Sequence, residues 1–291
     1  MTSILLIANP AVGGGRVPKL LPSVRRKLDS LGIQHRTGLT SSLDDAIRLT
    51  NEALDEGEIP VAFSGDGVAG VVARTASYRP ESVFGVLPGG TGNDFCGHVG
   101  IPDDAVEACE VLASGVPTTI DLGEANGVRF LGIASFGYDS LANESANAAP
   151  RWLGSAVYIW GAISAVIRWK TAHFTVIADG AEKSFDGWSV LCANTSRYGG
   201  GMLIAPNASI EDHQFDLICT LDSSRLRFIR MFPKVFKGTH IDDDNLDVSH
   251  AREVTVSADR PFTIYADGDP LTDLPAEIRI LPSAVKVLLP A

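Results

Sequence analysis

The sequence is poor in positive charge. Its 24 Lys and Arg residues stand against 35 Asp and Glu, which gives a formal net charge of -11 at pH 7. Broad nucleic-acid binding usually needs a basic face, so this balance argues against a nucleic-acid partner. It does not argue against an anionic nucleotide as a ligand, because local N–H groups, Lys, Arg and metal ions bind such a ligand whatever the charge of the whole chain.

Cysteine is scarce too. Four Cys residues are scattered over 291 positions and form no C-x-x-C pair. This spacing favours free buried thiols in a reducing cytosol over disulfides or a zinc site. The six His residues show no metal-ligand spacing either.

Long apolar runs are also missing. The longest uncharged stretch, Trp152 to Ile167, is shorter than the roughly 20 apolar residues of a membrane-spanning helix. It predicts a buried or interfacial helix over about 152–168, so any membrane contact would be peripheral. The N-terminus has no basic segment before its short apolar run, which predicts a first strand and not a signal peptide. We therefore expect a cytoplasmic protein.

The first part of the chain alternates strand and helix patterns. Apolar runs predict strands over 3–8, 34–39, 59–63 and 83–87. Helical patterns lie between them, over 18–31, after Ser42 and over 71–77, and another follows Asp103. This βαβα order predicts a doubly wound α/β domain over 1–118, with a parallel sheet and ligand loops at the carboxyl ends of its strands.

Near residue 118 the pattern changes to short β-rich segments. They predict a second domain over 119–280, mostly antiparallel and resembling a β-sandwich. The predicted strands cover 119–123, 128–134, 173–178, 189–193, 215–221, 254–257 and 262–266.

Three glycine-rich segments follow predicted strands of the first domain. They are Asn9-Pro10 with Gly13-Gly14-Gly15, then Ser64-Gly65-Asp66-Gly67, then Pro88-Gly89-Gly90-Thr91-Gly92-Asn93-Asp94. Glycines allow a backbone to approach phosphate oxygens and to point N–H groups at them. Asp66 and Asp94 can hold a divalent cation that bridges the phosphates. The segments predict a nucleotide site built for phosphoryl transfer.

Each segment also has an ordinary interpretation. The first can be a flexible connector, and Asp66 and Asp94 can be turn residues. Gly65 to Gly70 matches G-x-G-x-x-G, the motif of dinucleotide-binding oxidoreductases. However, it does not follow the first strand, and the next strand does not end in an acidic residue. The sequence therefore disfavours an oxidoreductase. Two carboxylates just past adjacent buried strands favour the phosphate site.

The order of these motifs resembles the diacylglycerol kinase/sphingosine kinase superfamily of lipid kinases. SGDG followed by LPGGTGNDF is the most specific part. Weaker similarities extend the resemblance over most of the chain, at 136–139, 199–206, 212–216 and 267–269. The resemblance implies a nucleotide domain, a C-terminal β-sandwich-like domain, an active-site cleft between them, and a last strand (281–291) that rejoins the first domain.

It also implies an ATP-dependent kinase that uses Mg²⁺ and phosphorylates a hydroxyl of a diacylglycerol-like or sphingoid lipid. A homodimer is compatible with this resemblance. The implied nucleotide contacts are Asn9, Pro10, Gly13, Gly14, Thr40, Gly65, Asp66, Gly67, Gly90, Thr91 and Asn93. The implied catalytic residues are Asp66, Asp94 and Asp269, and Asp66 and Asp94 would also contact the metal.

Two further sites are implied by family position. Asp269 stands where the family has the acidic residue of DGE, so it would be the general base, although Asp267-Gly268-Asp269 alone predicts a hairpin turn. Asp212, with Ser209 and Gln214, would hold a structural Mg²⁺, although His213 replaces the usual Gly. A solvated acidic turn is the alternative there.

One segment departs from the family. Its loop usually reads GGDGTxNEV, whereas this chain has Val68, Gly70 and Val71 in place of Thr, Asn and Glu. A catalytically impaired nucleotide- or lipid-binding pseudokinase therefore stays an alternative, and an NAD kinase-like enzyme is a further one.

A late segment is basic and aromatic. Arg225 to Lys237 can lie on an anionic bilayer, or it can pack its apolar side inward and leave a solvated basic face.

Overall fold

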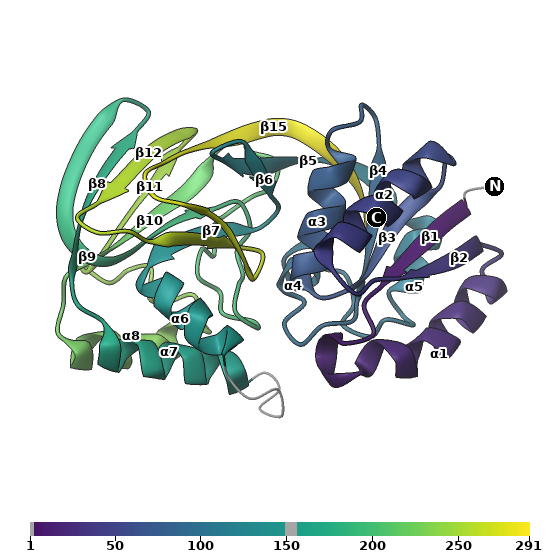
Figure 1. Cartoon of the computed structure of the whole chain (residues 1–291), viewed down its shortest axis with the longest axis horizontal. Helices are drawn as coiled ribbons and strands as arrows, with labels where there is room; N and C mark the ends of the chain where they lie inside the picture. The colour runs from purple at the N-terminus through teal and green to yellow at the C-terminus, as the bar shows by residue number, and fades with distance from the viewer. Residues whose placement is uncertain (1–2, 149–155) are drawn as a thin grey trace. The chain divides into compact units, whose positions relative to one another are not determined.

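The computed structural model describes residues 3–148 and 156–291 (Figure 1). The chain forms two compact units, one of residues up to Ile120 with Ser283–Ala291, the other of Asp121–Pro282. The predicted fold class, an α/β domain followed by a β-sandwich-like domain, is confirmed.

The first unit is built on a parallel sheet. Its strands run in the order β4 (Val83–Pro88), β3 (Ile59–Ser64), β1 (Ser3–Ala8) and β2 (Gln34–Leu39). β1, β3 and β4 are buried along almost their whole length, as expected for strands covered on both faces. At the other edge, Lys286 and Val287 of β15 (Ala276–Leu289) pair with β4 in parallel.

The described residues of this unit also form five helices and a 3-10 turn. They are η1 (Val12–Gly14), α1 (Arg16–Ser30), α2 (Leu43–Asp55), α3 (Asp66–Ala76), α4 (Asp94–Val99) and α5 (Cys109–Ser114). Ser42 caps α2 as predicted, because its Oγ accepts a hydrogen bond from the N–H of Asp45 at 3.1 Å. α3 begins at Asp66, five residues before the predicted helix.

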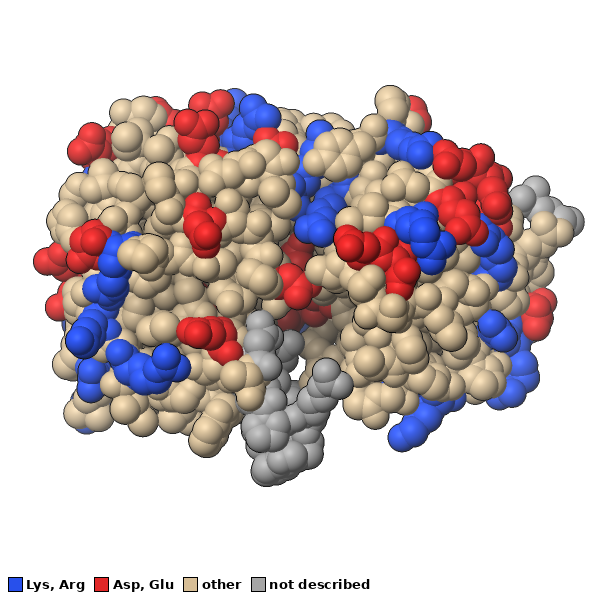
Figure 2. All heavy atoms as spheres, in the orientation of Figure 1, with Lys and Arg blue, Asp and Glu red and all other residues tan. Residues whose placement is uncertain are grey.

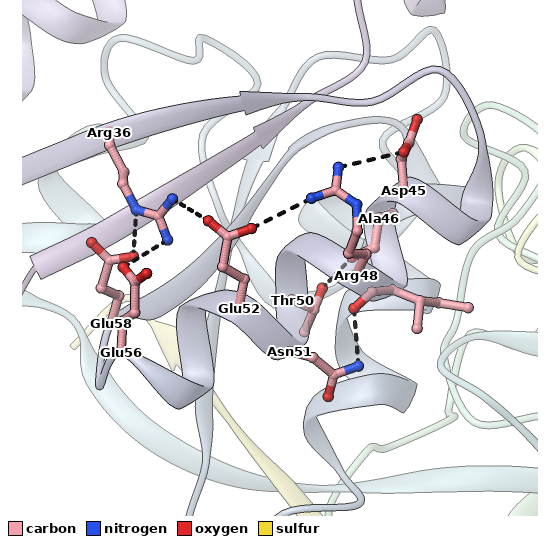
Figure 3. Close-up of polar contacts among 10 residues, drawn as sticks. Arg36, Asp45, Ala46, Arg48, Thr50, Asn51, Glu52, Glu56 and Glu58 are labelled. Carbon is pink, nitrogen blue, oxygen red and sulfur yellow. Dashed lines mark hydrogen bonds and ion pairs between the residues drawn. The ribbon is translucent and has the colours of Figure 1, made fainter.

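The edge strand β2 is held to α2 by ion pairs (Figure 3). Arg36 contacts Glu52, Glu56 and Glu58 at 2.5, 3.0 and 2.8 Å. Arg48 spans Asp45 and Glu52 on the same helix at 3.4 Å each. These groups are partly exposed, so each pair contributes little alone, and the network mainly fixes where β2 lies.

The second unit is antiparallel. β14 (Asp269–Asp273), β13 (Thr263–Ala266), β7 (Ile133–Gly137), β9 (Ala181–Ala193), β8 (Ala172–Ala178), β12 (Glu253–Ala258) and β15 are neighbours in that order. β9 also pairs with β10 (Phe215–Leu221), which pairs with β11 (Leu246–Ala251). β5 (Val116–Ala125) pairs with β6 (Val128–Phe130). One residue range predicted as a strand, 128–134, is thus split between β6 and β7.

The described part of the second unit has three helices: α6 (Tyr138–Asn147), α7 (Ala156–Arg168) and α8 (Arg225–Val235). They close a core rich in aromatic side chains, in which the ring of Trp188 stacks on Phe228 of α8 with 4.2 Å between centroids. The sequence predicted a helix over about 152–168. α7 covers its later part, and residues 152–155 lie outside the described residues. No helix was predicted where α6 lies.

Candidate active site

The three glycine-rich loops follow strands that end at the same edge of the parallel sheet. Ala8 lies opposite Leu39 and Phe63 in the register of β1 with β2 and β3. The residue that follows each of these three along the chain is polar: Asn9, Thr40 and Ser64. Parallel sheets bind ligands at this carboxyl edge, so the sequence prediction of where the loops gather agrees with the observed topology.

Close backbone contacts join the three loops. A Cβ on Gly13 would lie 2.5 Å from the carbonyl oxygen of Gly89, and a Cβ on Gly90 would lie 2.5 Å from the Cα of Gly65. Gly13 also has φ of 61°, in the left-handed region. Any side chain at Gly13 or Gly90 would therefore push neighbouring loops apart, which explains why this edge needs glycine.

Asp66 ties the second loop to the third. Its Oδ1 accepts a hydrogen bond from the N–H of Phe95 at 3.0 Å, and the amides of Asp94 and Asn93 donate to the same carboxylate. These amides form the first turn of α4, where a helix favours negative charge. Burial raises the pKa of the Asp66 carboxyl, and the amide hydrogen bonds oppose that rise.

Asn93 closes the third loop from within. It has φ of 53°, its Oδ1 accepts from the N–H of Gly90 at 2.8 Å, and its Nδ2 donates to Asp103 Oδ1 at 3.1 Å. Arg16 reaches the carbonyl of Asp103 at 3.2 Å. The Asn93 side chain thus shapes the loop, Asp94 beside it is buried, and Thr91 at the tip is exposed.

Two buried hydroxyls at this edge lack a hydrogen-bond partner among the described residues. They belong to Thr40 and Ser64, each 2% exposed. Thr40 donates its own N–H to the carbonyl of Ala8 at 2.9 Å, which fixes it beside β1. A buried hydroxyl without a partner costs free energy, so both are candidates for ligand contact. Thr40 was predicted as a nucleotide contact, whereas Ser64 was not singled out.

The substituted positions of the second loop lie inside α3. Val68 and Val71 are 5% and 2% exposed, and both belong to the core. Gly70 is buried between them. In this chain these positions therefore serve packing, and valine suits that environment better than a polar side chain would.

The predicted general base lies in a hairpin of the second unit. Asp267 and Gly268, with φ of 54° and 88°, form the two-residue turn between β13 and β14. Asp267 accepts from the amides of Leu131 and Gly132 at 2.9 and 2.8 Å, so it anchors the hairpin. Asp269 follows as the first residue of β14 and is half-buried.

The residues of the predicted structural Mg²⁺ site lie in one loop of the second unit and hydrogen-bond within that loop. The two carboxylate oxygens of Asp212 accept from the backbone and side-chain amides of Gln214 at 3.3 and 3.2 Å. The Oγ of Ser209 accepts from the N–H of Glu211 at 3.3 Å. Within residues 3–148 and 156–291, no cluster of three or more His, Cys, Asp or Glu could hold a metal. The loop is closed by hydrogen bonds between its own residues, and the structural Mg²⁺ site stays a prediction.

His213 also joins that loop to Asp121. Its φ is 63°, and both its N–H and its ring Nδ1 contact the buried carboxylate of Asp121, at 2.8 and 3.0 Å. A left-handed backbone usually selects glycine. The contacts with Asp121 compensate for the strain, which explains how His replaces the family Gly here.

A further glycine-rich turn lies in the second unit. Gly199, Gly200 and Gly201 have φ of 64°, 83° and 102°. Tyr198 before them donates its phenol to Asp139 Oδ1 at 2.6 Å. Burial raises the pKa of the Asp139 carboxyl, and the hydrogen bonds of Tyr198 and Ser189 oppose the rise. The sequence offered only the family motif as a signal for this anchored loop.

Comparisons with known proteins agree with this architecture. The family model described as the diacylglycerol kinase catalytic domain matches residues 3–125, and the model of the YegS C-terminal NAD kinase beta sandwich-like domain matches residues 132–289. A diacylglycerol kinase of Mycobacterium tuberculosis is 33% identical over 297 residues, covering 99% of this chain and 95% of the relative. One of Bacillus subtilis is 30% identical over 291 residues, covering 98% and 95%.

A solved structure shows the same fold. It is of a Bacillus anthracis protein provisionally called a diacylglycerol kinase, with a TM-score of 0.85 and 20% identity, covering 99% of this chain and 95% of that one. The predicted enzyme class, a lipid kinase, is confirmed by the curated relatives. The chain belongs to the diacylglycerol kinase-like superfamily, as its motifs implied. These relatives do not favour the pseudokinase alternative.

Proposed function

We propose that this lipid kinase transfers the γ-phosphate of ATP to a hydroxyl of a diacylglycerol-like lipid. The observation that carries the proposal is the convergence of three glycine loops at one edge of the parallel sheet, through the Gly13–Gly89 and Gly65–Gly90 contacts. Curated relatives named diacylglycerol kinase at 33% and 30% identity favour diacylglycerol over a sphingoid base.

The proposed nucleotide contacts are those of the first unit. Backbone N–H groups of the loops would meet the phosphates, as they do where glycine turns open onto helix N-termini. The hydroxyls of Thr40 and Ser64, buried without partners among the described residues, would gain hydrogen bonds from the ligand. The full proposed set is Asn9, Pro10, Gly13, Gly14, Thr40, Ser64, Gly65, Asp66, Gly67, Gly90, Thr91 and Asn93.

The chemistry would depend mainly on positioning. In the transfer, the lipid oxygen forms a bond to the γ-phosphorus while the bond to the bridging oxygen breaks, and ADP leaves. The proton of the lipid hydroxyl goes to a base, for which we propose Asp269. Backbone amides and basic groups would offset charge on the phosphoryl oxygens.

Mg²⁺ is proposed as the counterion of the ATP phosphates. This ion usually needs only one or two protein carboxylates beside phosphate and water ligands, so a cluster of three is not required. Asp94 is our first candidate, with Asp66 second, because the carboxylate of Asp66 already accepts several amide hydrogen bonds. For Asp212, Ser209 and Gln214 we keep the separate role that the family position implies, a structural Mg²⁺ that takes no part in the transfer.

The test is transfer of labelled phosphate from ATP to defined lipids. Purified protein is incubated with γ-labelled ATP, Mg²⁺ and either dispersed diacylglycerol or sphingosine, and the labelled lipid is identified by chromatography. We expect label in phosphatidic acid. Binding of ATP without label in any lipid would overturn the proposal and support the pseudokinase. Label in the sphingoid base alone would replace the proposed acceptor.

A further inference from the structure

Exposed apolar side chains concentrate on two helices of the second unit. Eleven large hydrophobic residues are exposed in the described part of the chain, and six belong to α7, to α8 or to the residue after α8. α7 presents Trp160, Ile163 and Ile167, which are 55%, 57% and 70% exposed. Their spacing places them on one helical face.

The exposed residues of α8 have the same character. Leu226, Ile229 and Phe236 are 57%, 52% and 43% exposed, and their spacing places them along one side as well. We call the six side chains together the α7–α8 face. A patch of this kind marks a surface that is covered by something else in use.

The α7–α8 face belongs to two helices that are fixed on their other side. Ala165 and Val166 of α7, and Phe228 and Met231 of α8, all join the same buried core. The guanidinium of Arg225 at the start of α8 donates to the carbonyl of Trp169 just after α7, at 3.0 Å. Figure 1 shows both helices on the same side of the unit. Their inner sides are therefore occupied, and the outer sides are presented together.

Basic residues lie along α8 and at the C-terminal end of α7, and no acidic residue lies on either helix. The exposed cations are Arg168, Lys170, Arg225, Arg227, Arg230, Lys234 and Lys237. In Figure 2, basic side chains gather at the end of the second unit where Figure 1 draws α8. This gathering is notable in a chain with a net charge of -11.

Not all of these cations are available. Asp243 pairs with Arg227 at 2.6 Å and with Lys234 at 3.9 Å. Arg230 and Lys237 have no ion pair with any residue in 3–148 or 156–291. They are the cations most open to an external anion, and Arg and Lys side chains can extend past apolar neighbours to reach it.

We propose that the α7–α8 face docks on the surface of an anionic lipid bilayer. Exposed Trp, Ile, Leu and Phe would enter the interface between headgroups and acyl chains, and the neighbouring cations would contact lipid phosphates. No described helix is long and apolar enough to cross a membrane, so the contact would be interfacial. A second copy of the chain suits the face less well, because it would bring like charges together.

The proposal extends the proposed function, since a diacylglycerol-like acceptor lies in a bilayer, but it can be tested without ATP. Vesicles of phosphatidylcholine, with or without phosphatidylglycerol, are pelleted with the full chain at low and high salt. We expect binding only to the anionic vesicles, and weaker binding at high salt. Arg230→Gln with Lys237→Gln should lower vesicle affinity about fivefold for each charge removed.

Controls separate this effect from charge loss in general. Arg25→Gln with Arg26→Gln removes the same charge from α1 of the first unit and should bind vesicles like the parent. Ile163→Ser with Ile229→Ser should lower binding at both salt concentrations, with parental thermal unfolding showing that the fold is intact. Transfer to a short-chain diacylglycerol dispersed in water should stay parental in the Arg230, Lys237 variant, so a failed kinase assay and a failed docking assay are distinguishable.

Three results would overturn the proposal. One is equal binding to neutral and anionic vesicles. Another is parental binding by the Arg230, Lys237 variant. The third is a dimer in solution that Ile163→Ser with Ile229→Ser converts to a monomer, which would assign the face to a second copy.

Discussion

The carboxylate of Asp66 receives the backbone N–H of Phe95, with 3.0 Å between Oδ1 and N. Asp66 begins α3 just after β3, and Phe95 lies in the first turn of α4 after β4. One side chain thus fixes the third glycine loop against the second. The residue that the sequence offers as a metal and phosphate contact has a structural task as well, and experiments on it must separate the two.

Two substitutions at Asp66 separate its structural role from its role in phosphate transfer. Asp66→Ala removes the acceptor from the first turn of α4, so we expect a loss of stability of about 1 kcal/mol together with loss of phosphate transfer. Asp66→Asn keeps an oxygen near the amide of Phe95 but removes the charge. It should lose less stability than Asp66→Ala and still lose most turnover. Thermal unfolding and kinase rates on both variants decide, and full turnover in Asp66→Asn would leave Asp66 as a helix cap only.

The fold was predictable where burial alone shapes the sequence. β1, β3 and β4 are buried on both faces, so each is a continuous apolar run. α6 was missed because its buried positions include Ala146 and Ser140, small residues that leave no apolar stripe. The first half of β9 was missed for a related reason, since its residues up to Asp186 are largely exposed and polar.

The candidate site was predictable only in its parts. Glycines and carboxylates after adjacent strands indicated where the loops gather. The contact of Asp66 with α4 could not be predicted, because it depends on how two separate loops lie in space. The missing partners of Thr40 and Ser64 have no sequence signal at all, since a hydroxyl is satisfied or not by its three-dimensional surroundings.

A matched glycine pair tests whether the loops must touch. Gly13 and Gly14 have nearly equal φ, 61° and 62°, so alanine suffers the same backbone strain at either. Only Gly13 has a neighbour in the way, the carbonyl of Gly89 at 2.5 Å. We expect Gly13→Ala to weaken ATP binding, measured by calorimetry, much more than Gly14→Ala. Equal losses would mean that the turn conformation matters and the loop contact does not.

Removing the unpartnered hydroxyls should affect stability and ATP affinity differently. Thr40→Val and Ser64→Ala remove buried groups that lack partners among the described residues, so stability without nucleotide should stay level or rise. ATP affinity should fall by about 2- to 10-fold if the ligand bonds these groups. Thr50→Val is the control, because its buried hydroxyl already donates to Ala46 at 2.7 Å. It should lose stability and keep ATP affinity, and the same pattern at Thr40 would remove that residue from the site.

Asp139 gives a pH dependence of stability. Burial raises its folded-state pKa above the unfolded value, so the folded protein holds a proton that the unfolded chain releases. The contribution of Asp139 to the free energy of unfolding is therefore favourable at low pH. It is lost as pH rises from about 4 through the folded-state pKa. Asp139→Asn keeps an oxygen for the phenol of Tyr198 and should flatten this part of the curve. Urea midpoints of parent and variant across the acid range measure it, and parallel curves would contradict the assignment.

The hairpin between β13 and β14 contains two aspartates with different expected roles. Asp267 accepts two backbone amides, from Leu131 and Gly132. Asp267→Asn replaces one acceptor with a donor that faces an N–H, so we expect a loss of roughly 1–3 kcal/mol in unfolding free energy. Turnover per folded molecule should change little, because the effect is on the anchor of the turn.

Asp269→Asn should behave in the opposite way. If Asp269 takes the proton of the lipid hydroxyl, the amide cannot replace it, and turnover should fall by roughly 10²- to 10⁴-fold while ATP affinity and stability stay near parental. Asp269→Glu places the family residue in the same strand position and should keep substantial activity. Steady-state rates with diacylglycerol and ATP, together with separate nucleotide binding, compare the variants. Near-parental turnover in Asp269→Asn would make Asp269 an ordinary first residue of β14 and move the search for the base to Asp94 or Asp66.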